Sequence, residues 1–506
     1  MDLPLIDLAV FFIYMLAIVL FGVSFSFRKR TTSDYTTGGG RLPAWAIGMS
    51  IFATFVSSIS FLALPGNAYL SNWNGFVFSL SIPLAAIIAV VFFVPLYRKL
   101  QSESAYFYLE QRFGLWARVY SSIFYLLTQL ARMGTILYLL ALPLNALFGW
   151  SIPLIIIITG VCVIIYSTFG GIEAVIWTDA VQGIVLVVGA IACLFVIFFS
   201  MPEGPQQVFE IANKADKFSL GSFDFNFVES TFWLILVYGL FINLQNFGID
   251  QSYIQRYLAA KTLKDAKKST LLGSLLYIPV SLLFFLIGTA LYSYYQAMPD
   301  LLPAYLHGSE NSDKIFPYFI VTALPVGITG LLIASIFAAG MSTISTSINS
   351  SATVILADHF KRYIQKDISQ KKSMRVLYMS SFCMGALGIV IGLALNGVES
   401  ALDAWWALAS IFSGGILGLF LLGFISAKAK SKSAAIGVIC GVLVISWMSL
   451  SRFVFTGSWS DLRSPFHNNL TIVLGTITVL FVGFIASFFI DKKINPTKIA
   501  SESIDL

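Results

Sequence analysis

The sequence AWAIGMSIFATFVSSISFLALPG, residues 44–66, is an apolar run with a cluster of hydroxyl groups near its middle. It is long enough to cross the hydrocarbon core of a bilayer, which is about 30 Å thick. Ser57, Ser58 and Ser60 fall at mid-depth. Opened backbone at that depth is tolerated only where it is buried in protein or lines a cavity. The stretch therefore predicts a membrane helix that is broken at a ligand site, where carbonyls and half-helix ends are available.

The whole chain has the composition of a polytopic membrane protein. Of its 506 residues, 58% are hydrophobic and only 11% are charged. We expect an all-α fold with thirteen membrane spans, near residues 4–26, 43–66, 76–96, 115–148, 151–168, 172–200, 231–258, 268–297, 327–358, 374–395, 401–425, 433–453 and 468–490.

Basic residues orient these spans. With the N-terminus outside, the cytoplasmic segments hold 25 of the 31 Lys and Arg residues, Arg118 and Arg256 among them. The positive-inside rule then predicts a cytoplasmic C-terminus. The basic cluster of the first span follows its apolar run, so we expect that span to be retained and not cleaved as a signal peptide. The net charge of +6 resides in these loops, and we expect no nucleic-acid partner.

A second span is also interrupted by polar residues. The sequence LVYGLFINLQNFGIDQSYIQRY, residues 236–257, places Asn243, Gln245, Asn246 and Gly248 at mid-depth. This span comes five spans after the first interrupted one, and an odd separation inverts its direction in the membrane. Spans two to six and seven to eleven therefore fit two inverted repeats with a site at their interface.

Arg132 lies near the centre of its span, where a cation is costly unless it meets a counter-charge or water. It is either a structural arginine bound to carbonyls or a binding group for an anionic substrate, since a guanidinium matches a carboxylate. Ser57, Ser58 and Ser60 would bind the same carboxylate at the helix break. Serines in apolar helices also bond to their own preceding carbonyls, which is the structural alternative.

A ladder of oxygen atoms follows in the sequence MSTISTSINSS, residues 341–351, which has seven hydroxyl side chains and no charge. In a helix, Ala339, Ser342, Thr343 and Thr346 share one face, with Ser345 on the adjoining stripe. Uncharged oxygen ligands favour a hard monovalent cation, although small residues also serve helix packing. Asp179 lies about two turns into its span and suits a cation site, unless it is only paired with a neighbour.

The sequence lacks the motifs that metal-dependent and nucleotide-dependent enzymes require. The four cysteines are scattered singly, without CxxC spacing, and neither a zinc motif nor a P-loop occurs. We therefore expect no metal hydrolase or ATP-driven pump, and no enzyme.

Several motifs, in order along nearly the whole chain, resemble those of the sodium/solute symporters, and within that family the bacterial sodium-coupled sialic acid transporters. They are TTGGGRLPAWAIGMSIFATFVSSIS, SAYFYLEQRF, GGIEAVIWTDAVQG, DQSYIQRYL, SIFAAGMSTISTSINSS and FLLGFISAKAKSKSAAIGVICG. The resemblance implies one extra span within residues 1–30, a core of ten helices in two inverted repeats over 31–427, and two further spans with a short tail over 428–506. The resemblance implies as well that the first and sixth core helices are broken.

The resemblance also implies which residues bind. A first sodium site would use the carbonyls of Ala53, Val56 and Ala339 and the hydroxyls of Ser342 and Thr343. A second would use Asp179, Ser342, Ser345 and Thr346. The substrate carboxylate would be held by Ser57, Ser58, Ser60 and Arg132, with Asn243 as a further polar group. Ser79 stands where the sialic acid transporters have a glutamine, which leaves the exact sugar open.

We therefore expect a secondary active transporter in a bacterial cell membrane that carries an anionic sugar acid, N-acetylneuraminic acid in particular, inward with two sodium ions. Rival hypotheses within the class are a sodium symporter for another carboxylate such as a monocarboxylate, or for a neutral sugar or proline. Arg132 argues against the neutral solutes. A membrane sensor and a passive channel are rivals of other classes, and the sequence does not determine the oligomeric state.

Overall fold

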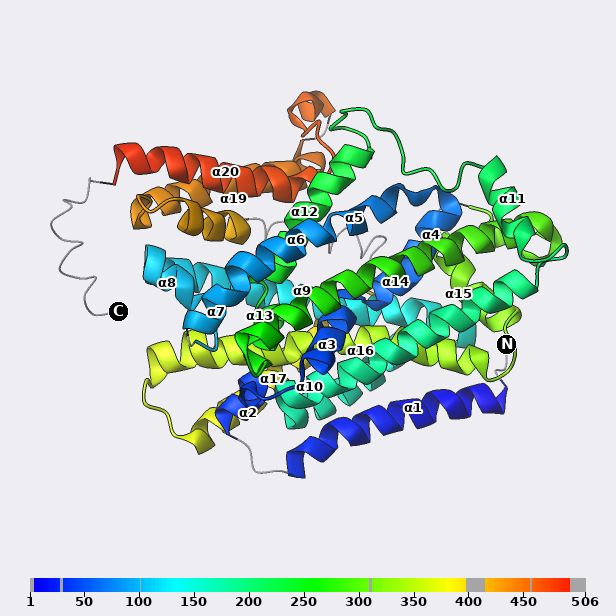
Figure 1. The fold of residues 1–506 in the computed structure, drawn as a ribbon, viewed down its shortest axis with the longest axis horizontal. Coiled ribbons are helices and arrows are strands. Elements are labelled where there is room, and N and C mark those ends of the chain that lie inside the picture. Colours follow the sequence, from blue (N-terminus) through cyan, green and yellow to red (C-terminus); the bar gives the residue numbers. More distant parts are fainter. Residues whose placement is uncertain are drawn as a thin grey trace.

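The computed structural model describes residues 4–27, 31–100, 102–308, 312–396, 415–455 and 457–491, and this part of the chain is helical without a named strand (Figure 1). Its longer helices are α1 (Leu5–Ser24), α3 (Ala44–Phe55), α4 (Ser58–Leu70), α6 (Ile82–Ile88), α7 (Val94–Leu100), α8 (Phe107–Phe113), α9 (Leu115–Phe148), α10 (Ile152–Phe199), α11 (Gln206–Lys214), α12 (Phe232–Ile249), α13 (Gln251–Ala259), α14 (Leu263–Ala297), α15 (Ser312–Thr322), α16 (Ile328–Val354), α17 (Gln370–Ala394), α19 (Ser431–Val454) and α20 (Leu470–Phe489). Other elements are α2 (Thr32–Thr37), α5 (Val77–Leu80) and the π-helix η8 (Ile355–Ile364) that continues α16.

Within the described residues, 10 helices are long and apolar enough to cross a membrane, or up to 11 if the bent pair α3 and α4 is one span. This confirms a polytopic, all-helical protein. α10 is one continuous element that covers two predicted spans, but Gly171 has a φ of 58° and divides it. A side chain at that position would be strained. The predicted span 401–425 lies outside the described residues up to residue 414, as do the basic residues at 28–30 and the tail from residue 492.

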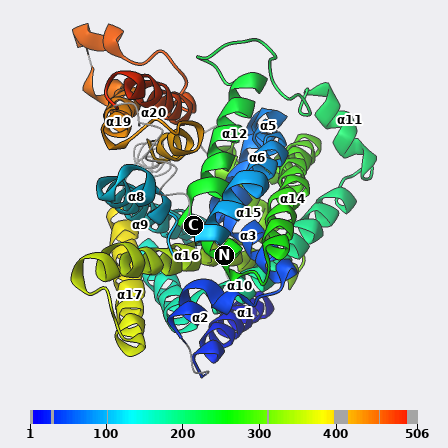
Figure 2. The ribbon, with the colours of Figure 1, turned by 60° about the vertical axis from the view of Figure 1, so that its left-hand side comes forward.

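α16 is the central helix of the bundle. In the span formed by α16 and η8, 89% of the most apolar window is buried in the protein, against 28–56% for the other nine spans. Two views show α16 running through the middle, with α1 at one edge and the paired helices α19 and α20 at the opposite edge (Figures 1 and 2). Its hydroxyl ladder therefore faces protein on all sides and not lipid.

Both interrupted spans are broken helices. α3 and α4 are bent by 55° where Val56 and Ser57 leave helical geometry. Ser57 accepts a bond from the Ser60 N–H and so caps the second half. The other break falls at Asp250, between α12 and α13, two residues beyond Gly248. The sequence thus predicts both interruptions, and the second one lies where the polar run ends and not inside it.

The first helix is joined to the central one by a buried carboxylate. Asp7 of α1 is 1% exposed, and its Oδ1 accepts hydrogen bonds from the Gly327 N–H at 2.7 Å and the Gly330 N–H at 2.8 Å. N–H groups at the start of a helix have no acceptor within that helix, and the helix dipole also favours a negative charge there. Asp7 therefore caps α16 from another helix.

Replacing Asp7 with alanine should lower the free energy of unfolding by about 1–2 kcal/mol, because two buried donors at a helix start lose their acceptor. Asp7→Asn should recover part of this loss, since the amide oxygen still accepts while the charge is gone. Thermal unfolding of the purified protein measures both variants. Equal stability of Asp7→Ala and the unmutated protein would show that the cap is dispensable.

Candidate functional site

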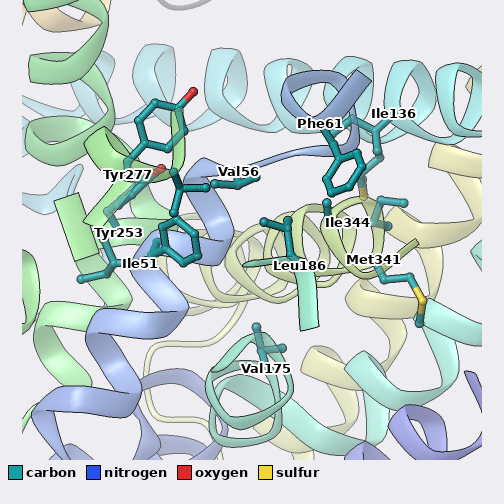
Figure 3. Close-up of a cluster of buried hydrophobic side chains, with 14 of the residues drawn as sticks. Ile51, Val56, Phe61, Ile136, Val175, Leu186, Tyr253, Tyr277, Met341 and Ile344 are labelled. Atoms are coloured by element: carbon teal, nitrogen blue, oxygen red, sulfur yellow. The ribbon is translucent and has the colours of Figure 1, made fainter. Parts of the chain in front are cut away.

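The residues predicted for the first sodium site meet at the break between α3 and α4. The Ser342 hydroxyl lies 3.0 Å from the carbonyl of Ala53 and 3.0 Å from that of Ala339, and the Thr343 hydroxyl lies 3.1 Å from the Ala339 carbonyl. These four residues and Val56 are at most 2% exposed. Figure 3 shows Val56 at the turn, with Phe61 of α4 near Ile344 of α16. A carbonyl oxygen of α3 near its break and oxygen atoms of α16 thus lie close together in the protein interior.

Two of the residues predicted for the second sodium site, Asp179 and Thr346, contact an arginine. Asp179 Oδ2 accepts from Arg256 Nη2 at 2.8 Å and from the Ser50 hydroxyl at 2.7 Å. The same Arg256 nitrogen donates to the Thr346 hydroxyl at 2.7 Å, and the Ser345 hydroxyl donates to the Ser342 carbonyl at 3.1 Å. Asp179 Oδ1 has no hydrogen-bond partner among the described residues. A cation at Asp179 therefore has Oδ1 available, while a guanidinium covers Oδ2.

Arg256 is buried, which the charge count made from the sequence did not show. We counted it among the basic residues of the cytoplasmic segments, and its side chain and that of Asp179 are both 0% exposed. Arg256 lies in α13, the second half of the broken helix. The alternative reading of Asp179 as a residue paired with a neighbour is thus correct for one of its two oxygens.

The arginine predicted to hold the substrate carboxylate lies beside a carboxylate of the protein itself. Arg132 of α9 has a carboxylate neighbour, because its Nη1 lies 3.7 Å from Asp250 Oδ2 at the break between α12 and α13. That separation is an ionic contact and not a hydrogen bond. Both side chains keep some exposure, 20% for Arg132 and 11% for Asp250. Among the described residues, no hydrogen bond or ion pair joins Arg132 directly to Ser57 or Ser60. The side chain of Ser58 is not among the described parts of the structure.

The two remaining predicted groups are buried. Ser79 donates to the Ser281 hydroxyl at 2.8 Å, and Tyr277 of α14 lies beside both Ser281 and Ser60. Ser79 is therefore linked through α14 to the broken helix. Asn243 is 0% exposed and donates to the Ser81 hydroxyl at 3.0 Å, while its side-chain oxygen has no partner among the described residues.

Four charged side chains form an ion-pair cluster where η8 meets α8 and α9, which we call the η8 cluster: Glu110, Arg118, Asp358 and Arg362. Arg118 donates to Asp358 Oδ1 at 2.6 Å and to Glu110 Oε2 at 2.7 Å. Asp358 also accepts from the Ser104 hydroxyl at 2.6 Å. From the sequence we counted Arg118 among the basic residues of the cytoplasmic segments, and the structure shows that its side chain is only 7% exposed. The cluster ties the far end of the central helix to its neighbours.

Acid should weaken the η8 cluster. Burial by itself would raise the pKa of Glu110, but hydrogen bonds from Arg118 and Arg362 outweigh it, so the pKa lies below its ordinary value. A lowered carboxyl pKa adds stability that is present above the ordinary value, near 4.5, and is lost as pH falls through the folded-state pKa. Glu110→Gln should thus lose about 1 kcal/mol at pH 7, with less difference from the unmutated protein near pH 3. Unfolding curves that differ by the same amount at both pH values would contradict this.

The chain is similar to known membrane transporters in both sequence and structure. The model of the sodium:solute symporter family matches residues 35–441. The sodium/sialic acid symporter NanT of Aliivibrio fischeri is 35% identical over 96% of this chain and 94% of its own length. The sodium-coupled monocarboxylate transporter 1 of Xenopus laevis is 28% identical over 90% of this chain and 73% of its own length. A solved substrate-bound, outward-open structure of a Na+-coupled sialic acid symporter is similar with a TM-score of 0.88 and 34% identity, over 96% of this chain and 98% of that one.

Proposed function

Because this chain belongs to the sodium:solute symporter family, we propose that it carries an anionic sugar acid, N-acetylneuraminic acid in particular, inward together with sodium. It is a transporter and not an enzyme, since the relatives that match it over nearly their whole length are symporters. The observation that carries the coupling is the buried junction of the Ser342 hydroxyl with the Ala53 carbonyl, 3.0 Å apart. A sodium ion at that point would join the broken helix to α16.

We propose thirteen spans in two inverted five-helix repeats, with the core over 31–427, an extra span before it and two spans after it. The bent pair α3 and α4, the division of α10 at Gly171 and the apolar helix 415–425 support the thirteen spans. The broken spans α3–α4 and α12–α13 take corresponding positions in the two repeats. We place the N-terminus outside and the C-terminus in the cytoplasm of a bacterial cell. In Figure 1, α1 begins on the right and α20 ends on the left, which fits an odd number of spans.

Two sodium ions are proposed. The first would be bound by the carbonyls of Ala53, Val56 and Ala339 with Ser342 and Thr343, all hard oxygen ligands of the kind that suit an alkali cation. The second would be bound at Asp179 Oδ1 with Ser342, Ser345 and Thr346. Two cations carried with one anionic substrate would make transport electrogenic.

The substrate carboxylate is proposed to bind Arg132 together with the hydroxyls and N–H groups at the start of α4, from Ser57, Ser58 and Ser60. The helix start adds a positive dipole end to the guanidinium. Asn243 and Ser79 would meet the uncharged part of the sugar. The Asn243 side-chain oxygen, buried without a described partner, supports this, because such a group normally has one in the loaded protein.

In this mechanism sodium binding precedes and completes the substrate site. An ion between α3 and α16 holds the break, and thereby Ser57 and Ser60, in the geometry that binds the carboxylate. When the protein opens inward, α3 and α16 separate, the first site loses ligands from one helix, and both solutes are released. Coupling requires that sodium favour one state over the other by a few kcal/mol.

Sialic acid uptake into proteoliposomes should require an inward sodium gradient and should accelerate with an inside-negative potential. The reason is that two charges of sodium exceed the single charge of the acid. Radiolabelled substrate uptake, with choline replacing sodium as the control, measures the effect. Undiminished uptake in the sodium-free buffer would reject the proposed coupling.

A monocarboxylate is the second candidate substrate, because the monocarboxylate transporter also matches over most of this chain, at lower identity. Arg132 would bind either acid, whereas a neutral sugar has no carboxylate for it to bind. Competition of labelled sialic acid uptake by a panel of sugar acids, short monocarboxylates, glucose and proline separates these substrates.

A further inference from the structure

Several buried polar atoms lack partners where α1 packs against α10, next to Asp179. Gln182 follows Asp179 by one helical turn and is 1% exposed. Neither its side-chain nitrogen nor its side-chain oxygen has a hydrogen-bond partner among the described residues. The same holds for Asp179 Oδ1 and for the hydroxyl of Tyr14, which belongs to α1.

These atoms lie together. The Tyr14 hydroxyl neighbours the Gln182 side chain and is within electrostatic range of Asp179. The Tyr166 hydroxyl neighbours Gln182 and Ser345, and donates to the Met341 carbonyl of α16 at 3.1 Å. α1 is held closely here, with Phe11 against Phe337 of α16 at 4.8 Å between ring centres. The group is thus enclosed by α1, α10 and α16.

Four atoms at this junction make no hydrogen bond of normal geometry among the described residues, although Tyr14 and Gln182 lie close to each other. Leaving buried polar groups without a well-formed hydrogen bond is costly. Native proteins normally satisfy such groups with ordered water or an ion. The groups present are a carboxylate oxygen, an amide and hydroxyls, with no imidazole or thiolate among them, which suits water and a hard cation.

The direction from which a cation reaches Asp179 follows from its other contacts. Oδ2 already accepts from Arg256 and Ser50, and the positive guanidinium repels a second cation on that side. Oδ1 is the oxygen without a described partner. A cation at Asp179 therefore binds away from Arg256, beside the polar groups of α1 and α10.

We propose that Gln182, Tyr14 and Tyr166 form a hydrated site at the α1–α10–α16 junction, whose water completes the shell of a sodium ion at Asp179 Oδ1. The inference rests on the proposed sodium coupling and adds to it that α1 supplies part of an ion site. Gln182 and Tyr14 are then specificity residues for the second ion and not for the substrate.

The test uses Gln182→Leu, Tyr14→Phe and a matched control, Thr178→Val. Thr178 precedes Asp179, but within the described part of the chain its hydroxyl bonds only to the carbonyls of Ala174 and Val175 in its own helix. Half-maximal sodium concentration and the Hill coefficient are measured for uptake, and sodium-induced thermal stabilisation is measured on purified protein. We expect the first two variants to need about fivefold more sodium, with a Hill coefficient falling toward one. Substrate affinity at saturating sodium should stay within about twofold, and Thr178→Val should resemble the unmutated protein.

Stability distinguishes an ion role from a structural one. Both variants remove unsatisfied polar atoms, so without sodium they should be at least as stable as the unmutated protein, and they should gain less stability when sodium is added. An unchanged sodium response in both would overturn the proposal while leaving sodium coupling intact. If the unmutated protein shows no sodium-dependent uptake, the proposed function itself fails. Tyr14→Phe removes a single oxygen and decides the matter should Gln182→Leu not fold.

Discussion

Arg132→Ala should lower the affinity for sialic acid by roughly 30- to 5,000-fold, which corresponds to the loss of about 2–5 kcal/mol on truncating one partner of a desolvated charge pair. Among the described residues, the ionic contact of Arg132 is with Asp250 at 3.7 Å, too long for a hydrogen bond, so its donors are available to a carboxylate. Sodium-induced thermal stabilisation should persist in the variant. Substrate binding by calorimetry in sodium buffer measures the change.

Two further variants separate the role of charge from that of geometry. Arg132→Lys keeps the charge but loses the two-pronged geometry, and should bind more weakly than the unmutated protein and better than Arg132→Ala. Asp250→Asn removes the carboxylate that competes for Arg132, yet asparagine still caps α13 by accepting from the Ser252 N–H, now made at 2.8 Å. It should leave affinity unchanged or increase it. Unaltered affinity in Arg132→Ala would remove the carboxylate role.

Asp179→Asn should both destabilise the protein and lower the Hill coefficient for sodium toward one. The destabilisation is about 3–5 kcal/mol, because Arg256 is left as a buried charge without its counter-charge. Both side chains are 0% exposed, so solvent does not reduce this cost. Thermal unfolding and sodium-dependent uptake are the two measurements.

The double variant Asp179→Asn, Arg256→Gln tells an ion ligand from a mere counter-charge. Removing both charges should restore much of the stability, since neutralising a buried pair together is often close to neutral. If Asp179 binds sodium, the Hill coefficient stays near one despite the recovered stability. If Asp179 serves only to balance Arg256, sodium cooperativity returns with stability, and the second sodium site has to be abandoned.

The sequence predicts the parts of the fold that depend on local chemistry. Apolar runs long enough to span a bilayer, the break at Val56 and Ser57, and the oxygen ladder of α16 are all present. Each of these features depends on neighbouring residues in the sequence. A membrane span needs a continuous apolar stretch of a certain length, and residues on one face of a helix recur with a fixed period. Ala53 and Ser342 were grouped through a family resemblance, and the structure brings them together.

The sequence did not predict which residues the charged side chains contact. A rule that counts Arg and Lys near span ends cannot tell a solvated residue from a buried one, and so it did not show that Arg256 and Arg118 are buried. From the sequence we did not predict the ionic contact of Asp250 with Arg132. We also did not predict that Asp7 caps the start of α16. The one local signal was an acidic residue two positions after the polar run 243–248, where that helix breaks.

By itself, then, the sequence determined a many-span helical transporter, its two broken helices and the hydroxyl-rich helix that they surround. Only the tertiary structure decided which charge meets which: Asp179 with Arg256, 77 positions along the chain, and Asp7 with the start of α16, more than 300 positions away. Burying a charge costs several kcal/mol unless an opposite charge or donor lies within a few ångströms, and the chain satisfies that condition only once distant helices have packed.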